Sequence, residues 1–185
     1  PGLSPRAIRP GDRVLVPGTV GDHGAAVMLA RNQNLVQGEL KSDCAPLHRL
    51  SAALRQLGSD LRVLRDPTRG GVATTLCEFV EGTALSILLE EEAIPVRPAV
   101  ASACDILGLD PLYCANEGKL LAVVAPERAE EALALLRGLP EGKNAAVIGT
   151  VGEQWPGRVA VRTALGGTRI CPAFAESDPM RKHII

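Results

Sequence analysis

The sequence predicts an α/β domain built around a mixed or antiparallel β-sheet. Segments with the period of a strand alternate with segments with the period of a helix, but without the strict strand–helix–strand order of a parallel fold. Hydrophobic residues make up 46% of the 185 residues and aromatic residues only 2%, so the core must consist mainly of leucine, valine, isoleucine and alanine. The apolar run Leu120–Val124 is typical of a strand that is buried on both faces.

The predicted strands are short apolar segments bounded by turn residues. A turn at Arg9–Asp12 precedes the first strand, and the alternation of Leu85, Ile87 and Leu89 shows the two-residue period of the third. In chain order, the expected strands are 13–16, 61–64, 85–89, 120–124, 147–151 and 159–161.

The predicted helices carry apolar residues three or four positions apart. Leu47, Leu50, Leu54 and Leu57 lie on one helical face, and Gly58 is expected to end that helix. In chain order, the expected helices are 25–31, 47–57, 72–82, 99–107 and 129–136.

Composition narrows the classes of partner. The 20 basic and 21 acidic residues nearly cancel and form no basic face, so nucleic acid and anionic membranes are not expected to bind. No apolar run approaches the roughly 20 residues needed to span a bilayer. Five cysteines without a Cys-x-x-Cys pair support neither a zinc site nor a disulfide framework, and a reducing, cytoplasmic setting is expected.

The segment Asp66–Gly71, Asp-Pro-Thr-Arg-Gly-Gly, is the first candidate for chemistry. It lies between a predicted strand and a predicted helix, where free backbone N–H groups and the helix dipole favour an anion such as phosphate. Arg69 could bind a phosphate oxygen, and Asp66 could hold Mg²⁺. The alternative is an ordinary type I turn that begins a helix.

Three further segments carry polar groups that could act at a site. Ser42 or Asp43 could cap the helix that follows, while Cys44 could be a thiol of low pKa. Glu117, just before the buried strand, could be a general base or a solvated turn residue. His23 lies between glycines, where it could reach a ligand or have only a structural role.

Five motifs together carry a resemblance to a known family. The motifs are Arg-Pro-Gly-Asp (9–12), Gly-Asp-His-Gly (21–24), Leu-Lys-Ser-Asp-Cys-Ala-Pro-Leu (40–47), Asp-Pro-Thr-Arg-Gly-Gly (66–71) and Ala-Asn-Glu-Gly-Lys (115–119). In this order and spacing they resemble the hydrogenase expression/formation proteins of the HypE family, within the aminoimidazole-ribonucleotide (AIR) synthase-related, PurM-like superfamily. The resemblance covers residues 9–170, and it is specific because five motifs occur in register.

The resemblance implies a domain organisation. Residues 1–45 would be the end of an N-terminal domain and a linking segment, 46–170 the C-terminal domain, and 171–185 a tail. The C-terminal domain would be a three-layer α/β/α unit with a mixed, largely antiparallel sheet. The start at Pro1 suggests an excised or processed piece. Because most of the ATP site would lie in the N-terminal half that is missing here, we expect the piece to be inactive alone.

The resemblance also implies an activity. Members of the family are ATP-dependent carbamoyl dehydratases that receive a carbamoyl group on a cysteine from a HypF-type carbamoyltransferase. They dehydrate the thiocarboxamide to a thiocyanate, and the cyanide passes to iron on the HypC–HypD scaffold of [NiFe]-hydrogenase maturation. ATP and Mg²⁺ are the implied cofactors, and the protein is expected to form a homodimer through its N-terminal domain.

The family pattern assigns roles to residues of this sequence. Glu117 would be the catalytic base, and Asp66 would hold Mg²⁺ through ATP. The residues expected to bind the cofactor are His23, Lys41, Asp43, Asp66, Thr68, Arg69, Gly70 and Gly71.

The end of the sequence departs from the family pattern, which closes on Pro-Arg-Ile-Cys with the acceptor cysteine last. This chain ends at Met180–Ile185, while Arg169–Cys171 repeats part of the motif, so Cys171 is a candidate acceptor. An altered tail and a loss of self-modification are the alternatives.

Two other functions stay open: a non-catalytic docking module for maturation partners, and another PurM-like enzyme of the selenophosphate, aminoimidazole-ribonucleotide or thiamine-phosphate type.

Overall fold

One seven-stranded β-sheet forms the centre of the protein. The computed structural model describes residues 2–31 and 40–173. The strand order is β2-β4-β1-β5-β3-β6-β7, and neighbouring strands are antiparallel except for the parallel pair β3 and β6. In chain order the strands are β1 (Arg13–Val16), β2 (Leu61–Arg65), β3 (Ser86–Glu90), β4 (Leu121–Val124), β5 (Ala146–Gly152), β6 (Val159–Arg162) and β7 (Thr168–Cys171).

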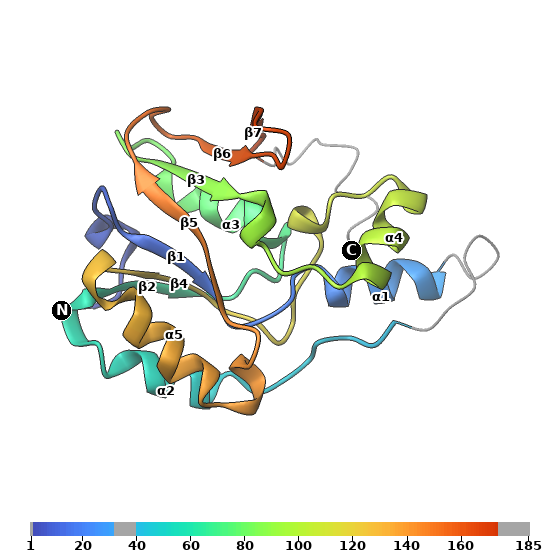
Figure 1. Cartoon of the computed structure of the whole chain (residues 1–185), viewed down its shortest axis with the longest axis horizontal. Coiled ribbons are helices and arrows are strands. Elements are labelled where there is room, and N and C mark those ends of the chain that lie inside the picture. The colour runs from blue at the N-terminus through green and yellow to red at the C-terminus, as the bar shows by residue number, and fades with distance from the viewer. Residues whose placement is uncertain (1, 32–39, 174–185) are drawn as a thin grey trace.

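Helices cover both faces of this sheet (Figure 1). Helices α2 and α5 pack together on one face, α3 covers the other, and α1 and α4 pair beyond one end of the sheet. Their bounds are α1 (Asp22–Arg31), α2 (His48–Arg55), α3 (Gly71–Val80), α4 (Pro98–Leu107) and α5 (Ala129–Arg137). The predicted α/β fold with three layers and a mixed, largely antiparallel sheet is therefore confirmed. Within the described ranges, none of these helices is long and apolar enough to cross a bilayer.

The central strands alternate their side chains between two hydrophobic cores. In β1, Val14 and Val16 pack in the core beneath α3, whereas Leu15 packs in the core beneath α2 and α5. In β4, Val123 and Ala122 divide between the two cores in the same way. Because both faces are covered, all four residues of β4 are buried, as its continuous apolar sequence predicts.

Most predicted elements are present, with small differences at their ends. The predicted strand at 13–16 is β1, without change. Helix α1 begins at Asp22, three residues before the predicted start, and α2 ends at Arg55. Gly58, with φ +60°, starts a short 3₁₀ turn instead of ending α2.

The segment before the predicted boundary near residue 46 contributes one strand to the sheet. Strand β1 lies in the middle of the sheet, where it pairs with β4 and β5. The turn before it is fixed by Asp12, whose buried carboxylate accepts from the backbone N–H of Arg9 (2.8 Å) and from Arg62 Nε (3.2 Å). Strand β1 therefore belongs to the same sheet as the strands that follow residue 46, and the assignment of 1–45 to the end of an N-terminal domain and a linking segment stays a prediction. Most of the predicted tail, from residue 174, lies outside the described residues.

A pair of leucine-to-alanine changes tests this packing. Leu54 of α2 is 0% exposed, while Leu165, between β6 and β7, is 100% exposed. We expect Leu54→Ala to lower the free energy of unfolding by about 2–5 kcal/mol, because it removes buried methyl groups and leaves a cavity. Leu165→Ala should change it by less than about 0.5 kcal/mol. Urea denaturation followed by circular dichroism measures both, and equal effects would contradict the arrangement of α2 on the sheet.

Candidate functional site

A cleft of about 960 Å³ opens at the end of the sheet where α1 and α3 meet the turn before β4. Its charged lining includes three arginines, three carboxylates and one histidine. The cleft brings together three of the motifs that the sequence singled out. Its lining residues are His23, Gly24, Val27, Met28, Arg31, Arg65, Asp66, Thr68, Arg69, Gly70, Thr74, Thr75, Glu78, Leu109, Cys114, Ala115 and Glu117.

The Asp66–Gly71 segment forms one wall of this cleft. It connects β2 to α3, and Gly70, with φ +70°, precedes the first turn of α3 without any side-chain cap. The backbone N–H groups of that turn are therefore available to an anion. Thr68 Oγ1 donates to Asp66 Oδ2 at 3.1 Å, and the exposed Arg69 also lines the cleft.

A buried hydroxyl without a protein partner lies next to this segment. Thr74 Oγ1 forms no hydrogen bond within the described part of the chain, although the atom is shielded from solvent. It lies so close to Gly70 that a Cβ at that glycine would overlap it. A buried hydroxyl usually has a partner, so this wall of the cleft fits a ligand with acceptor oxygens.

Asn116 connects three parts of the site by buried hydrogen bonds. Its side chain is fully buried, and its Oδ1 accepts from the backbone N–H of Gly21 at 2.8 Å. Its Nδ2 donates to the carbonyl oxygens of Cys114 (2.9 Å) and Pro67 (3.4 Å). One side chain thereby joins the loop before α1, the Asp66–Gly71 segment and the turn before β4.

Glu117 reaches the cleft from the turn before β4, and Asp43 lies behind it. The Asp43 carboxylate accepts from the Glu117 backbone N–H (3.2 Å) and from Lys119 Nζ (3.0 Å). Ser42 accepts from the backbone N–H of Cys44 and bonds to His23 Nδ1. The prediction that Ser42 or Asp43 caps α2 is wrong, because α2 starts at His48 without a side-chain cap.

The predicted residues differ in how close they lie to the cleft. Among the described residues, Asp66, Thr68, Arg69, Gly70, His23 and Glu117 line it, whereas Gly71, Lys41 and Asp43 do not. Lys41 is exposed, and its carbonyl oxygen accepts from Arg97 Nη2 at 3.1 Å. Sequence reasoning missed Arg97, Thr74 and the anchoring role of Asn116. The available sequence signal for Asn116 was its place in the Ala-Asn-Glu-Gly motif, just before the apolar run 120–124.

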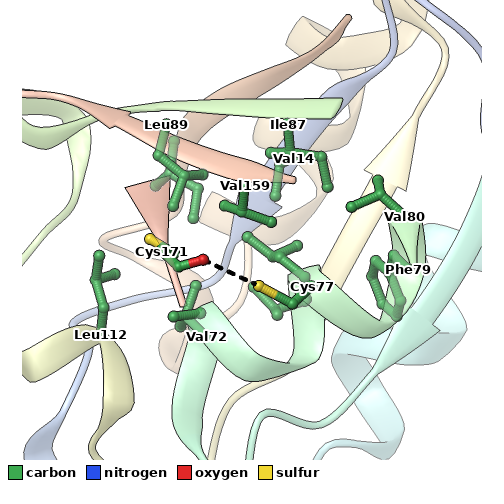
Figure 2. Close-up of a cluster of buried hydrophobic side chains, with 14 of the residues drawn as sticks. Val14, Val72, Cys77, Phe79, Val80, Ile87, Leu89, Leu112, Val159 and Cys171 are labelled. Carbon is green, nitrogen blue, oxygen red and sulfur yellow. Dashed lines mark hydrogen bonds between the residues drawn. The ribbon is translucent and has the colours of Figure 1, made fainter. Parts of the chain in front are cut away.

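Cys171 does not lie in the cleft. It ends β7 with 1% exposure and packs in the core beneath α3, where Cys77 Sγ approaches its carbonyl oxygen at 3.9 Å (Figure 2). Burial raises the pKa of the Cys171 thiol. The pKa of the Cys77 thiol is raised to about 12, mainly by burial and to a smaller extent by the neighbouring Cys171. A neutral, enclosed thiol is a poor nucleophile, so this position argues against Cys171 as the carbamoyl acceptor.

No group of three or more His, Cys, Asp or Glu side chains that could hold a metal occurs in the described ranges. Asp66 alone would suit Mg²⁺ only together with oxygens from a bound ligand, which is how Mg²⁺ usually binds beside phosphates.

Comparison with known proteins identifies the family. The family model for the AIR synthase related protein, C-terminal domain, matches residues 9–162. The chain belongs to this family. It is 50% identical over 169 residues to carbamoyl dehydratase HypE of Bradyrhizobium diazoefficiens, covering 91% of this chain and 49% of that protein. It is 48% identical over 150 residues to HypE of Escherichia coli, and the match covers 81% of this chain and 44% of that protein. The chain thus spans about half the length of the HypE proteins it matches.

Solved structures of relatives agree with this assignment. The chain resembles HypE in complex with ATP with a TM-score of 0.85 and 44% identity, covering 94% of this chain and 54% of that one. It resembles a HypE–HypF complex with a TM-score of 0.88 and 42% identity, covering 94% and 56%. A thiamine-monophosphate kinase from Stenotrophomonas maltophilia, 19% identical with a TM-score of 0.63, shares the fold alone. The predicted HypE resemblance of this AIR synthase-related chain is therefore confirmed.

Removing the Asn116 side chain tests the centre of the site. Asn116→Ala should lower the free energy of unfolding by at least about 2 kcal/mol, because buried backbone groups lose their partners. The exposed Asn144 offers a matched control, and Asn144→Ala should have little effect. Urea denaturation measures the loss, and hydrogen exchange at the Gly21 amide shows whether the loop before α1 has loosened. Unchanged stability and exchange in Asn116→Ala would contradict the described network.

Thiol labelling tests the burial of Cys171. Cys44 is the exposed cysteine, and the other four are buried. We expect one thiol to react quickly with an aromatic disulfide reagent at pH 8, and Cys44→Ser to remove that fast phase. Peptide mapping identifies the labelled residue. Labelling of Cys171 as fast as Cys44 would restore it as a candidate acceptor.

Proposed function

We propose that this chain is the C-terminal part of an ATP-dependent carbamoyl dehydratase, in which Glu117 and the Asp66–Gly71 segment act on the same substrate. The observation that carries the proposal is their convergence on one cleft, from segments about fifty residues apart. The reaction converts a thiocarboxamide, carried on a cysteine other than Cys171, to a thiocyanate. The similarity to HypE along the chain supports this choice of chemistry.

The phosphate groups of ATP would bind at the Asp66–Gly71 wall. The uncapped start of α3, Arg69 and the unpartnered Thr74 hydroxyl all suit phosphate oxygens. Asp66 would hold Mg²⁺ together with those oxygens. When bound, ATP supplies the phosphoryl group that turns the amide oxygen into a leaving group.

Glu117 would remove the protons of the amide nitrogen. Dehydration breaks the carbon–oxygen bond, with the oxygen leaving as phosphate, and removes two N–H protons to leave a carbon–nitrogen triple bond. A carboxylate at the cleft can accept such a proton. His23 also lines the cleft, where its ring could orient the substrate, and Lys41 would contribute positive charge near the entrance.

The whole protein would need further components. We propose a second, N-terminal domain through which the protein dimerises, a HypF-type carbamoyltransferase as donor, and a HypC–HypD scaffold as cyanide acceptor. The solved complex of a similar HypE with HypF supports the carbamoyltransferase as a partner. Cys171 has no part in the proposed reaction because its thiol is enclosed in the core.

The enclosed position of Cys171 favours a second candidate function. Without an accessible acceptor thiol on β7, the chain could serve as a docking module that binds maturation partners without turnover. ATP-dependent formation of a thiocyanate by the full-length protein separates the two functions, since a docking module would form none.

Replacing Glu117 tests the dehydratase proposal. In the full-length protein, Glu117→Gln should slow thiocyanate formation at least about 100-fold, because the amide side chain cannot accept the proton. Carbamoylation should continue, so the carbamoyl adduct should accumulate. Intact-mass analysis after incubation with the carbamoyltransferase, carbamoyl phosphate and Mg-ATP measures both steps.

The exposed Glu127 provides the matched control for that experiment. Glu127→Gln should form thiocyanate at the wild-type rate, because Glu127 lies outside the cleft lining. A Glu117→Gln protein as fast as the control would exclude Glu117 as the base.

A further inference from the structure

We infer that Asp43 is a positioning residue that holds Glu117 at the cleft, rather than a ligand of the nucleotide. This inference rests on the proposed role of Glu117 as the base. It changes the expectation from the family pattern, which groups Asp43 with the residues that bind the cofactor.

Both oxygens of the Asp43 carboxylate have partners on the turn before β4. Oδ1 accepts from the Glu117 backbone N–H at 3.2 Å, and Oδ2 accepts from Lys119 Nζ at 3.0 Å. The Asp43 side chain is only 3% exposed, and Asp43 is absent from the cleft lining. Burial of a charged carboxylate is costly unless the group is paired, and here both oxygens are paired with residues 117 and 119 rather than exposed to the cleft.

The backbone of Asp43 contacts the residue between these two partners. A Cβ on Gly118 would overlap the Asp43 carbonyl oxygen and lie 2.8 Å from the Ala45 nitrogen. Residues 117–119 are thus held at three successive positions, two by the Asp43 side chain and one by its backbone. Glycine is required at 118 because any side chain would push the two segments apart.

The segment 40–44 that carries Asp43 is itself anchored. Arg97 Nη2 donates to the Lys41 carbonyl oxygen (3.1 Å), while Arg97 Nε pairs with the buried Asp22 (2.5 Å). His23 Nδ1 and Ser42 Oγ lie 2.8 Å apart. Contacts from the starts of α1 and α4 therefore fix the segment, and through Asp43 they fix the position of Glu117.

This arrangement has a consequence for catalysis. A general base works only within hydrogen-bond distance of the proton that it removes, and a misplacement of about 1 Å can cost about 100-fold in rate. Loss of the Asp43 carboxylate would release the Glu117 backbone without removing any group that touches the nucleotide.

Kinetics of two Asp43 variants in the full-length protein test the inference. Asp43→Ala should lower kcat by about 30- to 100-fold while the KM for ATP stays within about twofold, because only the placement of the base changes. Asp43→Asn keeps an acceptor for the Glu117 N–H and should retain kcat within about fivefold. The exposed Asp105 is the matched control, and Asp105→Asn should behave as wild type.

A nucleotide ligand would behave differently. If Asp43 bound ATP or its metal, both variants would raise the KM for ATP, and Asp43→Asn would not be rescued. Either result would overturn the inference. If the Ala variant fails to fold, the KM for ATP and the kcat of the Asn variant still show whether Asp43 binds the nucleotide.

Amide hydrogen exchange, measured by NMR, tests the contact without any assay of activity. Asp43→Ala should speed exchange of the Glu117 amide at least about tenfold, while Asp43→Asn and the core amide of Val123 stay near wild type. Unchanged exchange at Glu117 would overturn the inference. A wild-type protein without dehydratase activity would count against the proposed function alone, because the exchange result still decides the role of Asp43.

Discussion

Close backbone packing around residues 112–119 is the constraint on which the candidate site depends. Gly71, with φ +66°, lies against the backbone of 112–114, where a Cβ would overlap the Leu112 carbonyl oxygen. Gly118 lies as closely against Asp43. A side chain at either glycine would force the neighbouring backbone to move, because its Cβ would lie well inside van der Waals contact. The hydrogen bonds of Asn116 then fix the loops that the glycines allow to meet.

The sheet makes this packing rigid. The 112–119 segment leads directly into β4, which lies between β2 and β1 and is buried on both faces. The Asp66–Gly71 segment leaves the neighbouring strand β2 and enters α3, whose inner face packs on the same sheet. Two walls of the cleft therefore begin at adjacent strands of one well-packed core. A site built on such elements is preorganised, so its groups need little rearrangement when a ligand binds.

The fold was largely predictable from the sequence, because the strands from β1 to β6 and the five helices carry their own patterns, whereas β7 was not among the strands expected from periodicity. The run at 120–124 indicated a doubly buried strand, and β4 is one. The site was less predictable, since its contacts join distant positions. Asp43 and Lys119 are 76 residues apart, and nothing local in either segment indicates their pairing. Local capping rules predicted that Asp43 caps α2, but α2 has no side-chain cap. Cys171 likewise repeats a family motif, but its burial depends on the pairing of β7 with β6.

Apart from Glu78, which lines the cleft and pairs with Arg65, four carboxylates around the cleft fall into two groups with different roles. Asp22 and Asp43 are buried and paired with Arg97 and Lys119, so they add little net charge and fix backbone positions. Asp66 and Glu117 are exposed at the cleft, and neither forms an ion pair within the described ranges. Only the second group is available to a ligand. Withdrawal of Asp43 from the cleft also removes one negative charge from the vicinity of a bound phosphate, where it would oppose binding. The same pairing that positions Glu117 therefore favours an anionic ligand beside it.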